Sequence, residues 1–395
     1  MSVNNKVPEI RFKGFSEEWI ENNVGQLCDF IVPGRTKPQI FDGDIPWVTT
    51  PDITSNSVSK SKIGLAISMD EAKRIGSKIV PKNSIIISCV GDLGLVAKVD
   101  NELIINQQLH AFTPKENISE WFLLYELLTR KKHMENVATK TSVPYMNKDN
   151  CNSIPIIFPY FEEQIQVGNF FQKLDNLINQ HQQKYDKLSN IKKAMLEKMF
   201  PKQGETVPEI RFKGFNGEWK EIELGDEVTF INGRAYSQEE LKDKGKYTVL
   251  RVGNFYTNLS WYYSDMELGD KYYADYGDLL YTWSASFGPH IWNGGKVIYH
   301  YHIWKLELSE NIEKLFLLHL LDYDRAKILS GSNGSTMIHI TKSAMEAKKV
   351  FIPKKDEQAA IGNYFQKLDT LINQHQQQIT KLNNIKQACL SKMFV

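Results

Sequence analysis

Three residues in the first third of the chain have side chains that a magnesium-dependent nuclease uses. Asp52 follows a proline, and Glu71 precedes Lys73 by two residues. Two carboxylates can hold Mg²⁺ while a lysine polarises a phosphate, which makes the three a candidate catalytic set. The same Glu-x-Lys spacing recurs at residues 240–242 and 346–348, and residues 69–75 are predicted to form a helical turn where such a site needs a strand. A standalone Mg-dependent nuclease therefore remains only as the alternative hypothesis.

Other catalytic and metal-binding patterns are absent from the sequence. It lacks the Asn/Asp-Pro-Pro-aromatic tetrapeptide of N6-adenine methyltransferases, a Walker A loop, a G-x-G-x-x-G fingerprint after a strand, G-x-S-x-G and H-E-x-x-H. His181 and His375 have no cysteine or carboxylate at metal-ligand spacing. We therefore predict no catalytic residue, no metal site and no cofactor in this chain.

Composition excludes several classes of protein. The 395 residues are 42% apolar and carry 48 Lys and Arg against 47 Asp and Glu, which excludes a strongly basic protein that binds nucleic acid by net charge. No segment approaches the roughly 18 apolar residues of a membrane span, and residues 1–13 lack the apolar region of a signal peptide. Four scattered cysteines fit a reducing environment. These features predict a cytoplasmic protein of two or three domains.

The sequence contains two copies of one unit. Residues 7–15 recur unchanged at 207–215, and residues 168–200 match 362–394 at 24 of 33 positions, an offset of 194. A period this long indicates a domain duplication, because solenoid repeats are much shorter. The predicted order is a first globular domain at 1–160, a long helix and linker at 161–206, a second globular domain at 207–354, and a second long helix at 355–395.

The two repeated helices carry narrow apolar stripes. Apolar residues alternate at spacings of three and four from Val167 to Met195 and from Ile361 to Cys389, which is typical of a coiled-coil seam. We expect the helices to pair with each other, antiparallel and related by a pseudo-two-fold axis. His181 and His375 are the midpoints of the two stripes. We therefore expect the histidines to be side-chain neighbours near the axis and to fix the helix-pair register.

The globular parts are predicted to mix strands and helices. Residues 84–88, 154–158, 279–282 and 350–352 have the pattern of short buried strands, and residues 121–131 and 314–327 that of helices. Between them lie loops rich in polar groups that read base edges, although each loop taken singly is ordinary turn chemistry. Equivalent loops differ between the copies while the surrounding sequence matches. This difference is what two readers of different DNA sequences would show.

Taken together, these features resemble the specificity subunit of type I restriction-modification systems. The resemblance covers the whole chain and rests on Pro-Glu-Ile-Arg-Phe-Lys-Gly-Phe opening each copy, a Gly-Arg loop, a short strand ending in Pro, Glu-Gln shortly after it, and a long helix. It implies an α+β fold of two α/β recognition domains, each reading one half of a split double-stranded DNA site. It also implies that the helices set the spacing and dock two methyltransferase subunits. Motor-nuclease subunits join that complex, and S-adenosylmethionine, ATP and Mg²⁺ are expected on the partners, while this chain is non-catalytic.

The resemblance maps the recognition loops onto six segments. In the second copy, residues 299–302 (Tyr-His-Tyr-His) stand where the first copy has Asn-Gln-Gln. Each domain is close to neutral, so we expect weak attraction to phosphates without partners. The candidate DNA-binding residues are Gly34, Arg35, Thr36, Lys37, Asn106, Gln107, Gln108, Lys140, Ser142 and Tyr145 in the first copy, and Gly233, Arg234, Tyr236, Ser284, Ser286, Asn333, Ser335, Thr336 and His339 in the second.

Overall fold

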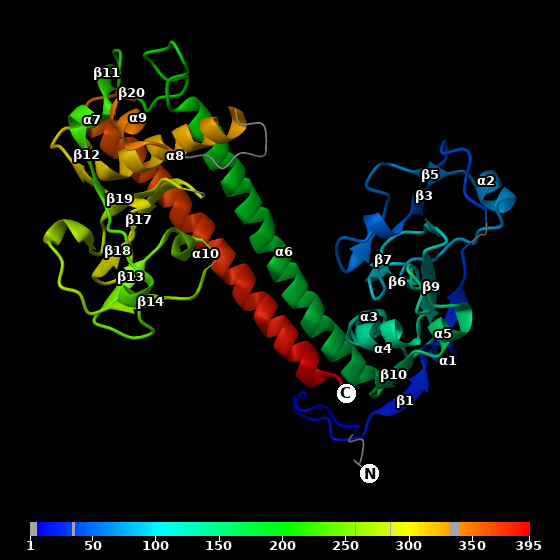
Figure 1. The fold of residues 1–395 in the computed structure, drawn as a ribbon. Helices are drawn as coiled ribbons and strands as arrows, with labels where there is room; N and C mark the ends of the chain where they lie inside the picture. Colours follow the sequence, from blue (N-terminus) through cyan, green and yellow to red (C-terminus); the bar gives the residue numbers. More distant parts are fainter. Residues whose placement is uncertain (1–5, 34–35, 257, 285, 332–339) are drawn as a thin grey trace. The chain divides into compact units, whose positions relative to one another are not determined.

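Two units, each with parts of both long helices, make up the fold. The computed structural model describes all residues except 1–5, 34–35, 257, 285 and 332–339. Unit 1 comprises Met1–Gln182 and Gln377–Val395, and unit 2 comprises Gln183–Gln376. The long helices α6 (Phe161–Lys198) and α10 (Lys355–Met393) are therefore each shared between the units (Figure 1). Sheets, short helices and a packed pair of long helices confirm the predicted α+β class, while the predicted domain boundaries stay predictions.

Unit 1 contains a five-stranded sheet in the order β2-β9-β6-β7-β4, a three-stranded sheet β5-β3-β8 and the pair β1-β10. Strands were predicted at 84–88 and 154–158, and β6 and β10 confirm them. The elements are β1 (Ile20–Asn23), α1 (Val24–Leu27), β2 (Cys28–Ile31), β3 (Ile45–Val48), β4 (Ser57–Val58), β5 (Ala66–Ile67), α2 (Met69–Arg74), β6 (Ile85–Ser88), β7 (Val96–Val99), β8 (Ile104–Ile105), β9 (Leu109–Pro114), α3 (Glu120–Thr129), α4 (Lys131–Val137), α5 (Lys148–Asn152) and β10 (Pro155–Phe158).

Unit 2 repeats most of these pairings, with four-stranded sheets β12-β19-β16-β17 and β14-β13-β18-β15 and the pair β11-β20. The parallel pair β13-β18 corresponds to β3-β8, so the duplication predicted from sequence extends to the sheet topology. The elements are β11 (Lys220–Glu223), α7 (Leu224–Glu227), β12 (Val228–Asn232), β13 (Tyr247–Leu250), β14 (Tyr262–Ser264), β15 (Tyr273–Ala274), β16 (Leu279–Thr282), β17 (Gly288–Ile291), β18 (Val297–Tyr299), β19 (Ile303–Leu308), α8 (Lys314–Gly331), α9 (Lys342–Glu346) and β20 (Lys349–Ile352).

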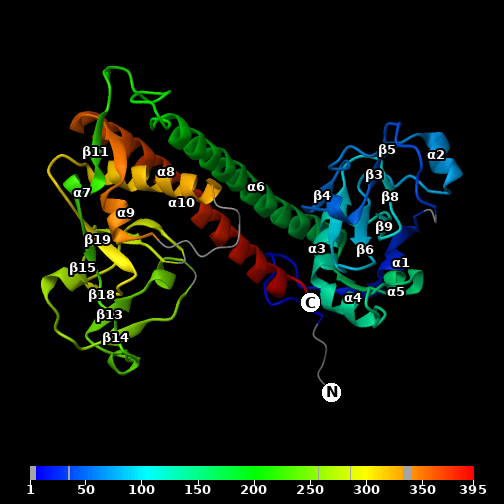
Figure 2. The ribbon, with the colours of Figure 1, turned by 45° about the horizontal axis from the view of Figure 1, so that its top comes forward.

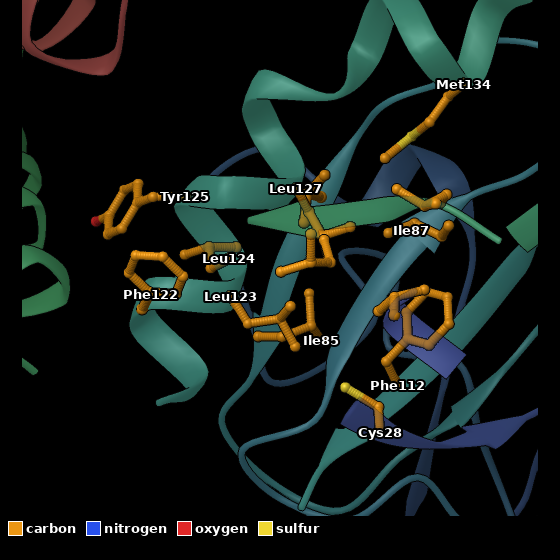
Figure 3. Packing of buried hydrophobic residues seen from close by; sticks show 14 of the residues in the cluster. Cys28, Ile85, Ile87, Phe112, Phe122, Leu123, Leu124, Tyr125, Leu127 and Met134 are labelled. Carbon is orange, nitrogen blue, oxygen red and sulfur yellow. The ribbon is translucent and has the colours of Figure 1, made fainter. Parts of the chain in front are cut away.

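The core of unit 1 forms where α3 covers the five-stranded sheet. β6 consists of three isoleucines and Ser88, and all four residues are buried, as expected for a central strand with both faces covered. Figure 3 shows side chains of α3 directed at Ile85 and Ile87 of β6 and Phe112 of β9. Burying each such side chain contributes about 1.5–3 kcal/mol, so this cluster holds the sheet and the loops at its strand ends in place.

Within each unit, the beginning of one long helix lies beside the end of the other. In unit 1 the rings of Phe171 and Phe394 are 5.6 Å apart, and in unit 2 those of Phe200 and Phe365 are 6.1 Å apart. The two contacts are equivalent at the offset of 194. Since early residues of each helix meet the end of the other, the halves run antiparallel in both units, as predicted.

A matched ion pair joins the helices in each unit. Lys386 Nζ lies 2.6 Å from Asp175 Oδ1 in unit 1, and Lys192 Nζ lies 2.6 Å from Asp369 Oδ1 in unit 2. Their side chains are only 16–28% exposed, so solvent screens the pairs less than it screens surface ion pairs. His181 and His375 belong to different units, and their mutual approach stays a prediction.

The repeated opening segment of each copy is hydrogen-bonded to both long helices. Arg11 donates two hydrogen bonds of 2.7 Å to Glu163 of α6, and Arg211 donates two of 2.6 Å to Glu357 of α10. The backbone N–H of Ile10 bonds Lys392 O at the end of α10. At the equivalent place in unit 2, Ile210 bonds Lys198 O at the end of α6 (2.9 Å in both).

Glycines allow each long helix to cross a domain helix closely. A Cβ at Gly168 would come within 2.9 Å of the Phe122 backbone nitrogen, and one at Gly362 within 2.8 Å of the Phe316 nitrogen. Figures 1 and 2 show α8 beside α10 at this second crossing. The crossing explains why both copies keep glycine inside a helix, where it otherwise costs about 1 kcal/mol relative to alanine.

The contact that a domain helix makes with the aspartate of the ion pair differs between the units. In unit 1 the Tyr125 hydroxyl of α3 donates a 2.6 Å hydrogen bond to Asp175 Oδ2. The equivalent residue of α8 is His319, whose buried ring has no hydrogen-bond partner within the described residues and lies 3.9 Å from Asp369. Burial lowers the pKa of His319 to about 3, so the ring is neutral at pH 7. A cavity of about 680 Å³ adjoins it.

Replacing His319 by Tyr should stabilise unit 2. The cavity offers room for a phenol, and its hydroxyl can donate to the Asp369 carboxylate as Tyr125 does to Asp175, a charge-assisted bond worth about 1.5–3 kcal/mol. We expect chemical denaturation to give a higher free energy of unfolding for H319Y than for the wild type. The variant H319F, which fills the same space without a hydroxyl, is the matched control and should gain less.

The same variants should weaken the pH dependence of stability. In the folded state His319 stays neutral until the pH falls to about 3, whereas in the unfolded state it protonates below a pKa of about 6.5. Protonation of the unfolded state therefore lowers the free energy of unfolding as the pH falls from about 6.5 towards 3. Unfolding curves at pH 7 and pH 5 should therefore differ less for H319F than for the wild type. An unchanged difference would show that His319 is not the group responsible.

Candidate nucleic-acid interface

In unit 1, two of the predicted recognition loops are joined by a third segment. Cys89–Gly91 follows β6, and the Cys89 N–H donates to Gln108 O (2.8 Å) while Cys89 O accepts from Met146 N (2.8 Å). Gly91 N donates to Pro144 O (2.9 Å). The turn between β8 and β9 and the loop at 139–145 therefore meet at this segment. The sequence does not indicate this segment as part of a site, because a buried strand end carries no polar signal.

Hydrogen bonds of the Asn106 and Gln108 side-chain amides stabilise the β8–β9 turn. Gln108 N donates to Asn106 Oδ1 (3.1 Å), and Asn106 Nδ2 donates to Gln108 Oε1 (3.2 Å). The Thr50 hydroxyl donates to the same Gln108 oxygen (3.2 Å). Asn106 is buried, whereas Gln107 and Gln108 are exposed. Of the three predicted residues, Asn106 therefore shapes the turn and the two glutamines face solvent.

The remaining candidate DNA-binding residues of the first copy do not all join this cluster. Lys140, Ser142 and Tyr145 are exposed on a loop closed by the bond from Thr139 N to Tyr145 O (3.0 Å). Thr36 and Lys37 are also exposed, but no hydrogen bond or ion pair within the described residues joins them to the other two loops. Gly34 and Arg35 lie outside the described residues.

In unit 2 the segment after β16 again meets the following turn, with Trp283 N donating to His302 O (3.1 Å), and here the Gly-Arg loop joins them. Arg234 N donates to Tyr299 O (3.1 Å), Tyr301 N donates to Arg234 O (3.0 Å), and Trp283 Nε1 donates to Tyr301 O (2.9 Å). Gly233 packs so closely that a Cβ there would lie 2.4 Å from His300 O. The Gly-Arg loop, the segment after β16 and the β18–β19 turn thus form one cluster. Asn333, Ser335, Thr336 and His339 lie outside the described residues.

The β18–β19 turn keeps the geometry of the β8–β9 turn with other side chains. His302 N lies 3.4 Å from His300 Nδ1, as Gln108 N lies 3.1 Å from Asn106 Oδ1. Burial, with smaller contributions from His302 and Arg251, lowers the pKa of His300 to about 4. Tyr301 is exposed between the two histidines. The second copy therefore has different side chains from Asn-Gln-Gln, and these side chains occupy the same positions in the turn.

Several predicted residues of the second copy have structural partners. Arg234 makes two hydrogen bonds to Glu240 (2.7 and 3.1 Å), which lower the pKa of Glu240, and its guanidinium lies 5.2 Å from the Tyr236 ring. Ser284 is buried, whereas Ser286 is exposed. The accessible groups of this cluster are therefore Ser286 and Tyr301, and sequence reasoning did not single out Tyr301 as a site residue.

The candidate nuclease residues hold turns in place and do not form a metal site. Asp52 accepts from Thr49 N (2.7 Å) and Lys62 N (2.7 Å), and Glu71 accepts two bonds from Arg74 (2.6 and 2.7 Å). Arg74 and the Gln39 N–H lower the pKa of Glu71 to about 2. Residues 69–74 are helical, as predicted. Across the part of the chain that is described, no group of three or more His, Cys, Asp or Glu could hold a metal ion.

Comparison with known proteins gives one consistent result. The family model described as the type I restriction modification DNA specificity domain matches residues 16–190 and 216–384. The MjaIX specificity subunit of Methanocaldococcus jannaschii is 22% identical over 401 residues, covering 94% of this chain and 90% of the relative. The EcoR124I/EcoR124II specificity subunit of Escherichia coli is 26% identical over 178 residues, covering 43% of this chain and 44% of the relative.

A solved structure shares the fold. The crystal structure of a type I restriction-modification S subunit from M. genitalium superposes with a TM-score of 0.68 at 16% identity, covering 98% of this chain and 99% of that one. None of the helices in the described ranges is both long and apolar enough to cross a bilayer.

Mg²⁺ should leave the stability of the chain unchanged. A ligand that binds only the folded state raises its melting temperature by mass action, and neither Asp52 nor Glu71 is free to bind one. Thermal unfolding with and without millimolar Mg²⁺ should therefore coincide. The variant D52N should melt at a lower temperature in both conditions because the turn loses an acceptor. Stabilisation by Mg²⁺ that D52N abolishes would restore the nuclease hypothesis.

Proposed function

Because the chain belongs to the family of type I restriction-modification DNA specificity domains, we propose that each recognition domain reads one half of a split double-stranded DNA site. One observation carries this proposal. Equivalent turns hold equivalent places in both units, yet one presents Gln107 and Gln108 and the other His300, Tyr301 and His302. A shared framework with different exposed polar groups is the arrangement expected for two readers of different sequences.

The proposed contacts fall into two groups. Gln107, Gln108, Ser286 and Tyr301 are exposed at the turn clusters, where they can reach base edges. Lys37 and Lys140 are exposed cations suited to phosphates, which position a protein on DNA without reading sequence. Asn106, Gly233, Arg234, Tyr236 and Ser284 shape these clusters and support the contacting groups.

We place partner docking on the two long helices. Leu177 of α6 and Leu371 of α10 are equivalent residues, and both are 43% exposed. Two matched apolar positions on nearly identical helices suit two copies of the same partner, and we propose that these are the methyltransferase subunits. Motor-nuclease subunits complete the proposed complex in the cytoplasm, and S-adenosylmethionine, ATP and Mg²⁺ bind those partners.

Charge supports a role for the partners in DNA binding. Residues 1–160 contain 18 basic and 18 acidic side chains, and residues 207–354 contain 18 and 20. Affinity for DNA phosphates and its salt dependence both follow the number of phosphates neutralised, so the isolated chain should bind weakly. The helices are proposed to set the spacing of the half-sites, with His181 and His375 near the centre of the pair.

Exchange of one domain should change one half-site. We expect a chimera with residues 20–150 of a relative, assembled with its methyltransferase partners, to methylate a site in which only the half read by the first domain has changed. Sequencing of methylated adenines in a host genome measures this. The reciprocal exchange within 220–350 is the matched control, and a change in both halves by either chimera contradicts separate reading.

Removing the matched leucines should remove partners one at a time. Burying a leucine contributes about 1.5–3 kcal/mol, so L177E or L371E alone should weaken one docking site at least about tenfold and the double variant both. Native mass spectrometry should show two, one and no methyltransferase subunits for the wild type, each single variant and the double variant. I63E, at a residue 80% exposed on the first recognition domain, should keep two.

A further inference from the structure

The side-chain amide of Gln108 is held in one orientation by its neighbours. The backbone N–H of Gln108 can only donate, so the atom of Asn106 that it meets at 3.1 Å must be the carbonyl Oδ1. The Asn106 amide nitrogen is then the atom facing the Gln108 side chain at 3.2 Å. Because that nitrogen also can only donate, Gln108 must turn its Oε1 inward.

The inward oxygen has its hydrogen-bonding capacity filled. A carboxamide oxygen has two lone pairs, and Gln108 Oε1 accepts from both Asn106 Nδ2 and the Thr50 hydroxyl at 3.2 Å. Asn106 is only 8% exposed, so water does not readily displace it. The exposed end of Gln108 is therefore its Nε2, which has two N–H donors and no acceptor.

This orientation restricts the bases that Gln108 can recognise. A glutamine binds adenine bidentately by accepting from N6 and donating to N7, and that contact needs a free Oε1. Guanine presents two acceptors, N7 and O6, in the major groove. Two outward N–H donors match guanine and leave adenine N6–H₂ without a partner.

We propose that Gln108 is a specificity-determining residue that reads a guanine in the half-site of the first domain, with Asn106 as the positioning residue that fixes its amide. This inference rests on the proposed function and names the base at one position. The same framework recurs in the second domain, where His302 N takes the place of Gln108 N and His300 Nδ1 that of Asn106 Oδ1. The backbone contact thus belongs to the turn, while the side chains that it positions differ between the copies.

The substitution N106D tests the clamp without changing the contacting residue. A carboxylate at 106 can still accept from Gln108 N but cannot donate, so the Gln108 amide should flip, donate one N–H inward and expose Oε1 beside its other N–H. That pair is the signature that binds adenine. The full chain carrying N106D, expressed with its methyltransferase partners, should shift from guanine to adenine at one position by roughly 10- to 100-fold.

A second variant keeps the test valid if N106D does not assemble. Q108E has nearly the same shape, and its outward oxygen can only accept, so guanine should be lost at the same position and cytosine, whose N4 donates, should replace it. N101D adds the same charge at an exposed residue of the same domain that lies outside the β8–β9 turn and outside the proposed contacts. It should leave the base preference unchanged.

The readout is the consensus of methylated sites in a host genome for each full complex. A guanine in the wild-type consensus that becomes adenine with N106D, or cytosine with Q108E, supports the inference. A specific wild-type consensus whose bases both variants leave unchanged, or that changes with N101D as well, overturns it while the proposed function stands. Wild-type methylation without a split consensus overturns the proposed function itself.

Discussion

Within each unit, one long helix is tied to the other by an ion pair that occurs at equivalent positions in both units. Asp175 meets Lys386 in unit 1 and Asp369 meets Lys192 in unit 2, each pair joining the helix that follows one copy to the helix that follows the other. The aspartate in unit 1 also accepts from Tyr125 and Asn56 of the recognition domain. Neither recognition domain is therefore packed on its own helix alone, and each unit is complete only with residues from both halves of the sequence.

The recognition clusters show how one framework can present different chemistry. Their backbone bonds run between strand ends fixed by a packed core, so the exposed side chains can change without moving the turn. The Asn106 clamp and the His300 contact are two versions of the same local device, in which a side chain accepts from the backbone two residues on. In the proposed function, specificity then depends on a few exposed groups and on the buried residues that orient them.

Much of the fold could be predicted from the sequence because it follows from periodicity and repetition. The duplication, the long helices and the buried strands at 85–88 and 279–282 are all present. The role of Cys89–Gly91 and the Arg234–Glu240 pair could not be predicted, since both depend on contacts between distant segments. The stripe midpoints predict His181 and His375 as the centre of the helix pair, and this register stays a prediction. The repeated ion pairs of Asp175 and Lys192 could not be predicted, because apolar periodicity locates a seam but does not identify the charged contacts beside it.

The claim that the matched ion pairs hold the helices together is tested most directly by a double-mutant cycle. The free energy of unfolding is measured for the wild type, D175N, K386M and the double variant, and separately for D369N and K192M. Because the side chains are largely buried and the charged atoms 2.6 Å apart, we predict a coupling free energy of about 1–2 kcal/mol in each cycle. Coupling indistinguishable from zero in both cycles would contradict the account.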